Sequence, residues 1–456
     1  MKLYFRFDRC SEPYRLENFL NCPDLNNSQL HRVSLSPVIQ TIIRRTYTTQ
    51  ENLRHLIGFG TALPLDQKYI IAIGVGHAPW QWCGPDSTGL GTNRENPEIK
   101  NIFEFLSEEQ LAHLRERKAY FLIDQTHEGY HADWLWDWFD NSCRDYSIPP
   151  SQIIYLTGDM NTERSYYEWT VLNDKTQEMC VIACPHFEEV IHDVSLGYTE
   201  FGLPRPGKIV MRKLPDYDHH LAFKKQDMGA IHPFNILQKR PRGHRLWFFK
   251  YLYEADLVTR NIISMNQFGY HQTYMEGKTM DPETCAKVNT VLPLMPLENP
   301  EDYTIDNFSS HDGGHYILKI SDVTMLKSFL TVVSEASCAD IENNCFISEK
   351  TFKPIACQHP FIILGSKGVL KNLQDIGYKT FHPYIDESYD SLPTYERMEA
   401  IVKELQRLQA FSTAEWLEFY QNVEGILKYN YRHFKNRSKS YVRRIYQRLA
   451  DHVGRN

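Results

Sequence analysis

Residues 334–365 read SEASCADIENNCFISEKTFKPIACQHPFIILG, and this stretch decides the expected fold. Ser348 is a residue type that caps helices, and Glu349 and Lys350 would fill the first turn of the helix that follows. The N–H groups and positive dipole end of a helix start suit a phosphate, and Lys350 would add a full charge. Glu349 could accept both hydroxyls of a ribose. An ordinary capped surface helix with an acidic first turn has the same pattern.

Strand and helix patterns alternate around this stretch. FLTVVSEAS, EKTFKPIAC, PFIILG, SKGVLKNLQDIG and KTFH predict strand, helix, strand, helix and strand, and HRLWFFKYLYEADL and NIISMN predict a helix and a strand before them. Farther upstream, KYIIAIGVG, KAYFLID, SQIIYLTGD and EMCVIAC read as strands with helical patterns between them. Such alternation predicts parallel, doubly wound sheets.

A polar stretch rich in Pro and Gly, residues 203–243, interrupts this alternation. We therefore predict an α/β protein with two Rossmann-like domains and a helical C-terminal extension. The expected boundaries are 1–230 for the N-terminal Rossmann-like domain, 231–412 for the C-terminal one, and 413–456 for the extension. Ligands of two such domains usually bind in the cleft between them.

The composition is that of a folded globular protein. The chain has 456 residues, and its net charge of −7 gives no overall attraction to nucleic acid or an anionic membrane. Charged residues interrupt the apolar start of MKLYFRFDRC, and no run reaches the length of a membrane span, so we predict neither a secretory signal nor a transmembrane segment. Ten scattered Cys without CxxC pairs favour a reducing cytoplasm, that of the host cell if the chain is viral.

Two groups of residues resemble metal sites. Cys180, Cys184 and His186 lie close in sequence, but the apolar residues between the two cysteines favour a short buried strand. Asp216 and Asp218 form a DxD pattern, whose two carboxylates could hold a divalent metal, but they lie in the irregular stretch rather than after a buried strand. We therefore predict no metal ligands. The absence of GxxxxGK[ST] and of GxGxxG after a strand argues against a P-loop kinase and a dehydrogenase.

The C-terminal residues predict three helices, of which the last is basic and amphipathic. Nine Lys and Arg fall between 428 and 456 against the single acid Asp451. Tyr441, Val442, Ile445, Leu449 and Val453 form an apolar stripe. Such a helix could contact a membrane surface or nucleic acid, or it could pack on the body of the protein with a solvated basic face.

The segment FISEKTFKPIACQHPFIILG resembles the C-terminal donor-binding motif of α-1,3-fucosyltransferases, over roughly residues 329–385. A closer likeness, which includes IIYLTGDMNTERSYYEW and RGHRLWFFKYLYEADL, is to fucosyltransferase-like glycosyltransferases of phages and large viruses, mostly uncharacterised. The resemblance implies an inverting, metal-independent GT-B enzyme that uses a nucleoside-diphosphate sugar, with a GDP-sugar favoured and no permanently bound cofactor. Glu349 would contact the ribose and Lys350 the diphosphate.

The chain departs from the motif of that family in two places. Pro354 stands where the family has a continuous helix, so we expect a kink or a late helix start. The usual VPVV-like strand is here HPFIILG. Farther on, Asp386, Glu387 and Tyr389 follow a predicted strand and could bind sugar hydroxyls, although a solvated acidic loop has the same sequence character.

An inverting transfer needs a general base for the acceptor and cations for the departing diphosphate. Glu128 is the first candidate for the base and Asp124 the second, because FLIDQTHEGYHADW places them where a strand ends. Arg242 and Arg245 begin a predicted helix and could contact the diphosphate or be ordinary helix-end charges.

These residues predict a glycosyltransferase whose acceptor is a glycan or a hydroxylated DNA base. The alternative is a structural or binding protein, such as a virion or surface component, that retains a degenerate glycosyltransferase fold. Donor binding that depends on Glu349 and Lys350 distinguishes the two.

Overall fold

The computed structural model describes most of the chain in two compact units. Unit 1 comprises Met1–His186, Phe201–Leu203 and Lys439–Asn456, and unit 2 comprises Phe187–Glu200 and Pro204–Ser438. The described residues are 1–6, 33–34, 36, 38–39, 41–42, 56–60, 67–75, 103, 106–127, 129, 134–176, 178–196, 214–226, 228–238, 241–265, 268, 270–291, 320, 322–338 and 344–455.

Unit 1 is built on a seven-stranded sheet with the order β3-β1-β4-β5-β6-β7, in which β2 pairs with β4. All these pairs are parallel except β2 with β4. The strands are β1 (Leu3–Arg6), β2 (Val33–Ser34), β3 (Ile57–Gly60), β4 (Tyr69–Val75), β5 (Ala119–Gln125), β6 (Ile153–Thr157) and β7 (Cys180–Ala183).

Alternate residues of these strands form two cores, one on each face of the sheet. Phe121 and Ile123 pack with Trp136, whereas Tyr120 and Leu122 pack on the opposite face with Leu449. Each such apolar side chain contributes about 1.5–3 kcal/mol by its burial. The described helices that follow the strands are α4 (Glu108–Arg115), α5 (Trp134–Asp145) and α6 (Thr162–Leu172), with a 3₁₀ turn at Pro150–Gln152.

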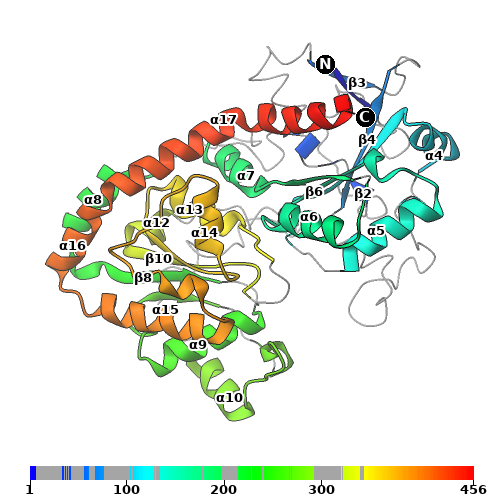
Figure 1. Cartoon of the computed structure of the whole chain (residues 1–456). Helices are drawn as coiled ribbons and strands as arrows, with labels where there is room; N and C mark the ends of the chain where they lie inside the picture. The colour runs from blue at the N-terminus through cyan, green and yellow to red at the C-terminus, as the bar shows by residue number, and fades with distance from the viewer. Residues whose placement is uncertain are drawn as a thin grey trace. The chain divides into compact units, whose positions relative to one another are not determined.

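Unit 2 is built on a parallel four-stranded sheet with the order β11-β10-β8-β9. Figure 1 shows α9 and α15 on one face of this sheet and α13 and α14 on the other. The strands are β8 (His232–Leu237), β9 (Ile262–Ser264), β10 (Ser328–Ser334) and β11 (Phe361–Leu364). The helices are α7 (His186–Ser195, the first residue assigned to unit 1), α8 (Tyr217–Gln226), α9 (Gly243–Glu254), α10 (Pro282–Val291), α12 (Asp322–Leu326), α13 (Glu349–Ala356), α14 (Val369–Asp375), α15 (Thr394–Gln409) and α16 (Thr413–Asn422), with 3₁₀ turns at Met228–Ala230, Tyr270–Thr273 and Ser388–Ser391.

The three helices expected at the C-terminus are present, but the second ends at Asn422 and the last, α17 (Glu424–Arg455), begins earlier than its basic segment predicted (Figure 1). Its residues up to Ser438 belong to unit 2 and those from Lys439 to unit 1. Its apolar stripe, including Tyr441 and Leu449, lies in the core of unit 1. The stripe is therefore not available as a membrane-binding face, and the helix exposes its polar side.

The structure confirms the α/β class, with two parallel sheets, and corrects two details. KTFH forms no strand, and residues 379–381 have no regular structure. Helix α13 starts at Glu349 with Pro354 inside it, so of the two expected effects of this proline, a kink or a late start, the late start is wrong; the N-cap of Ser348 explains the early start. Among the described residues, no helix is both long enough and apolar enough to cross a membrane.

Candidate functional site

The carboxyl edge of the unit 2 sheet contains a topological switch point. The chain leaves β8 through α9 toward β9, and it leaves the adjacent strand β10 through α13 toward β11, on the opposite side. The starts of α9 and α13 therefore meet beyond the same two strand ends. In open α/β sheets, ligands bind at such points.

The start of α13 is capped as its sequence predicts. Ser348 has an extended backbone, and its Oγ accepts a hydrogen bond from the backbone N–H of Lys350 at 3.3 Å. The Lys350 Nζ also lies 3.2 Å from this Oγ and 2.6 Å from Glu349 Oε1. The ammonium group is thus held directly at the positive end of the helix.

Glu335, the residue after β10, holds both helix starts in place. Its buried carboxylate accepts bonds from the Ser348 N–H (3.1 Å), the Ser348 hydroxyl and the Thr351 hydroxyl (2.6 Å). Its backbone carbonyl lies 3.1 Å from His244 Nε2 and accepts a bond from Arg245 Nη2, also at 3.1 Å. One residue thereby connects α13 to α9.

Among the described residues around the two helix starts, cations outnumber carboxylates. Lys350, Lys353, Arg242 and Arg245 stand against Glu335 and Glu349, a difference of two positive charges. Burial opposes ionisation of Glu349, but Lys350 and Lys353 outweigh it and lower the pKa of this carboxyl. Burial lowers the pKa of Lys353 to about 8, against the opposing effect of Glu349. With two helix starts beside them, these charges favour an anion.

The two predicted arginines have different environments. Arg245 is buried, and its guanidinium donates to the carbonyls of Ser334 and Glu335 at the end of β10. Arg242 is exposed and donates to the carbonyl of Ala336, so it is the arginine that a ligand can reach. Burial, with the nearby arginines, lowers the pKa of His244 to about 3, so this ring is neutral at pH 7.

Ser348, Glu349, Lys350, Arg242 and Arg245 therefore lie at one edge, as a shared donor site requires. Ser348 and Glu349 are buried, with 1% and 4% of their surface exposed. In this structure Glu349 is paired with Lys350, and a ribose could reach its carboxylate only after that pair opens.

The predicted sugar-binding residues lie elsewhere in unit 2. Phe381 packs edge-on against Phe361, the first residue of β11, and the Asp386 N–H donates to Glu404 in the second half of α15. Both contacts place Phe381 and Asp386 toward the amino edge of the sheet, away from Lys350. Glu387 accepts a bond from the Phe381 N–H, and Tyr389 is buried with its hydroxyl at the Ile363 N–H. The chain then returns to the carboxyl edge, where Asp390 accepts a bond from the Leu370 N–H at the start of α14.

In unit 1, Asp124 lies near the carboxyl end of β5 and is almost fully buried. One carboxylate oxygen accepts bonds from the Ser36 hydroxyl and the Val38 N–H, and the other from the N–H and hydroxyl of Thr126. With four donors on it, this carboxylate holds the surrounding backbone together. Glu128, the first candidate for the base, lies outside the described residues.

His127 lies at the same edge and is a second candidate that the sequence prediction passed over. Its ring is 5.1 Å from that of His186, whose Nδ1 is hydrogen-bonded to the Tyr441 hydroxyl at 2.8 Å. Burial lowers the pKa of His127 in spite of Asp124, which raises it. The ring is therefore neutral at pH 7 and can accept a proton.

Both sequence patterns that resemble metal sites have other roles. The Cys184 thiol lies 3.4 Å from the Tyr441 hydroxyl, and Cys180 lies in β7. Asp216 accepts a bond from the His219 N–H at the start of α8, whereas Asp218 is exposed and lies 3.6 Å from Lys428. The DxD pattern is thus a helix start.

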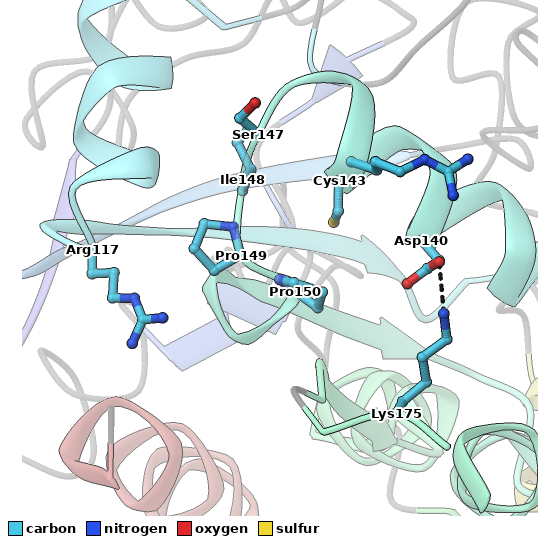
Figure 2. Close-up of a pocket in the computed structure, with 9 residues that line it drawn as sticks. Arg117, Asp140, Cys143, Ser147, Ile148, Pro149, Pro150 and Lys175 are labelled. Carbon is cyan, nitrogen blue, oxygen red and sulfur yellow. Dashed lines mark hydrogen bonds and ion pairs between the residues drawn. The ribbon is translucent and has the colours of Figure 1, made fainter. Parts of the chain in front are cut away.

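A hollow of about 540 Å³ in unit 1 lies at the amino edge of the sheet (Figure 2). Pro149 and Pro150 lead into β6 there, and Lys175 pairs with Asp140 at 2.8 Å. Burial raises the pKa of the lining Cys143 to about 12, so its thiol is not nucleophilic at pH 7. Catalytic groups of α/β sheets gather at the other edge, so this hollow is the weaker candidate.

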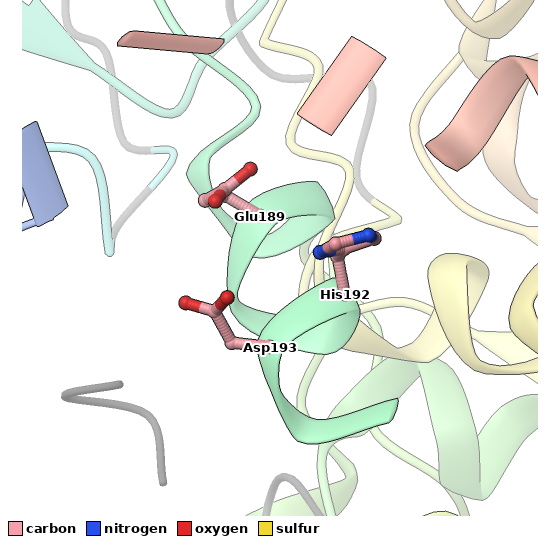
Figure 3. A group of neighbouring side chains, drawn as sticks. All are labelled: Glu189, His192 and Asp193. Carbon is pink, nitrogen blue, oxygen red and sulfur yellow. The ribbon is translucent and has the colours of Figure 1, made fainter. Parts of the chain in front are cut away.

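Figure 3 shows the group of three metal-ligand side chains found among the described residues, Glu189, His192 and Asp193 on α7. One ligand atom from each lies within 4.8 Å of the others. Glu189 Oε2 also accepts a bond from the Ser438 hydroxyl at 2.7 Å. This group lies apart from the α9 and α13 starts in sequence and was not predicted.

Sequence reasoning missed Glu335 and Lys353 as site residues, and it preferred Glu128 and Asp124 to His127 on the same loop. Glu335 ends the apolar strand FLTVVS, and a charged residue directly after a buried strand is the signal that would have indicated it. Protein-family models give no match to this chain, and none of the curated proteins matches it.

Proposed function

We propose that this protein is a glycosyltransferase of the GT-B type that moves a sugar from a nucleoside-diphosphate sugar to a hydroxyl acceptor. The observation that carries the proposal is the pair of helix starts, α9 and α13, that Glu335 holds beside Lys350 and Arg242. The resemblance of residues 329–385 to the fucosyltransferase donor motif supports it independently.

In this proposal, the diphosphate lies across the two helix starts. Lys350 exchanges its bond to Glu349 for one to a phosphate oxygen, and Glu349 then becomes free to accept the ribose hydroxyls. The exposed Arg242 contacts the same diphosphate. The acceptor oxygen bonds to the anomeric carbon as the bond from that carbon to the diphosphate breaks, and the electron pair leaves with the diphosphate.

The acceptor proton passes to a general base. Glu128 remains the sequence-based candidate, and His127 is the described residue whose protonation state suits the role. Asp124 is less suited because four donors already occupy it. Lys350 and Arg242 would balance the charge of the leaving group, so the reaction needs no metal. The acceptor is a glycan or a hydroxylated DNA base.

A test of the donor site is calorimetric titration of GDP, UDP, CDP, ADP and dTDP, with and without magnesium. Wild type should bind one diphosphate selectively, and Lys350→Ala and Glu349→Ala should weaken that binding about 10-fold or more, since each removes a charge-assisted contact. Binding should be equal in EDTA. If binding required a metal, the predicted metal independence would be wrong, and Glu189, His192 and Asp193 would be the first residues to test as its ligands. No binding at millimolar nucleotide would refute the donor site.

A non-catalytic binding protein is the second candidate, and the Glu349–Lys350 pair and the occupied Asp124 carboxylate favour it. Such a protein would bind a nucleotide without turning over its sugar. Release of nucleoside diphosphate from a panel of sugar nucleotides, in wild type and in His127→Ala and Glu128→Gln, separates the two. Turnover in wild type alone supports the enzyme.

A further inference from the structure

A tight hairpin lies beside the start of α9. Met275 and Lys278 exchange backbone hydrogen bonds of 2.8 and 2.9 Å, and the two residues between them have positive φ angles, 46° for Glu276 and 77° for Gly277. This is the geometry of a two-residue type I′ turn. Glutamate rarely adopts a positive φ, but here the Thr394 hydroxyl donates to the Glu276 carboxylate at 2.7 Å and holds this residue in the turn.

The hairpin is fixed to the carboxyl edge of the unit 2 sheet. The Tyr395 hydroxyl donates to the Met275 carbonyl at 2.8 Å, and Thr394 also reaches the carbonyl of Cys338, just beyond β10. Trp247 of α9 donates from Nε1 to the Thr273 carbonyl at 2.9 Å. The residues on both sides of Tyr274 are thus held by α9 and α15.

The Tyr274 backbone is packed directly against the first residue of α9. A Cβ atom at Gly243 would lie 2.4 Å from the Tyr274 carbonyl oxygen, so only glycine fits there. Thr273 and Met275 are buried, whereas the side chain of Tyr274 has 65% of its surface exposed. An exposed aromatic residue therefore stands on a fixed backbone that touches Gly243, the residue that follows Arg242 of the proposed diphosphate site.

We propose that Tyr274 stacks on the nucleobase of the bound nucleoside diphosphate. This inference rests on the proposed donor site. An exposed ring has only two side-chain torsions to fix, and base–aromatic stacking contributes about 1–3 kcal/mol. The helix starts would then bind the phosphates of the ligand, and the hairpin would bind its base.

The test compares two ligands, the selected nucleoside diphosphate and inorganic pyrophosphate, by titration calorimetry. Tyr274→Ala should weaken nucleotide binding roughly 5- to 150-fold, the range that this stacking contribution implies, and leave pyrophosphate binding within about twofold. Tyr274→Phe keeps the ring and should bind the nucleotide as wild type does. Lys350→Ala should weaken both ligands.

Tyr253→Ala is the matched control. Tyr253 is also an exposed tyrosine, at 39%, but it lies near the other end of α9, about 15 Å along the helix from Gly243. It should bind both ligands normally. Equal nucleotide affinity in Tyr274→Ala and wild type would overturn the stacking role, as would an equal loss for pyrophosphate.

Two further results separate the inference from the function on which it rests. If wild type binds pyrophosphate as tightly as every nucleotide, the stacking role is wrong and the anion site stands. If wild type binds neither, the donor site and the stacking role are both wrong.

Discussion

Replacing Glu335 with alanine should destabilise unit 2 more than any surface change at the same edge. The substitution removes the acceptor of three donors, the Ser348 N–H, the Ser348 hydroxyl and the Thr351 hydroxyl. A buried donor without a partner costs about 1–3 kcal/mol, and neighbouring losses are not additive. We therefore expect Glu335→Ala to lower the free energy of unfolding by about 3–5 kcal/mol.

Differential scanning calorimetry measures this loss. At about 2–4 °C per kcal/mol for a domain of this size, the transition of unit 2 should fall by roughly 6–20 °C. Asp386→Ala is the control, because this exposed carboxylate bonds within its own turn, to Ser388, whose N–H lies at 3.0 Å, and its loss should shift the transition by less than about 2 °C. Glu335→Ala melting within about 2 °C of wild type would refute the role of the Glu335 carboxylate in holding the start of α13, since the backbone carbonyl that bonds His244 and Arg245 remains in the variant.

Three other perturbations test separate parts of the structure. Burial lowers the pKa of Lys224 to about 7 from its ordinary 10.5. Between these pH values the unfolded chain holds more protons than the folded protein, so the free energy of unfolding should rise with pH. Melting temperatures measured over this pH range should rise for wild type and rise less for Lys224→Met. Gly243→Ala should cost about 1–3 kcal/mol in urea unfolding, because the hairpin at Tyr274 must move, whereas Gly229→Ala, with open space around it, should be neutral. Leu449→Ala should cost about 2–5 kcal/mol in unit 1, and a loss below 1 kcal/mol in the same assay would contradict the packing of α17 in that core.

The local parts of the candidate site could be predicted from sequence. The start of a helix depends on residues within one turn of it. The residue types of Ser348, Glu349 and Lys350 were therefore sufficient to predict where α13 starts. The strands that end at Asp124 and before Glu335 were likewise indicated by continuous apolar runs.

The long-range parts could not be predicted. The Glu335 carbonyl bonds His244 and Arg245 only because β8 and β10 are adjacent in the sheet. The order of strands in a sheet cannot be predicted from a local sequence pattern. The loop with Asp386 has the sequence of a sugar-binding loop, but its path toward the amino edge is set by packing of Phe381 on Phe361. The charge state of His127 depends on its burial, which the sequence does not give.

The division of α17 between the units has a consequence for biosynthesis. One face of the unit 1 core includes Tyr441 and Leu449, and the Tyr446 hydroxyl bonds the Met1 carbonyl. A ribosome delivers these residues only after all of Pro204–Ser438 has been made. While unit 2 is synthesised, the part of the unit 1 sheet that α17 covers therefore stays exposed to solvent. A stop codon shortly before Lys439 should then yield a chain that aggregates and binds chaperones.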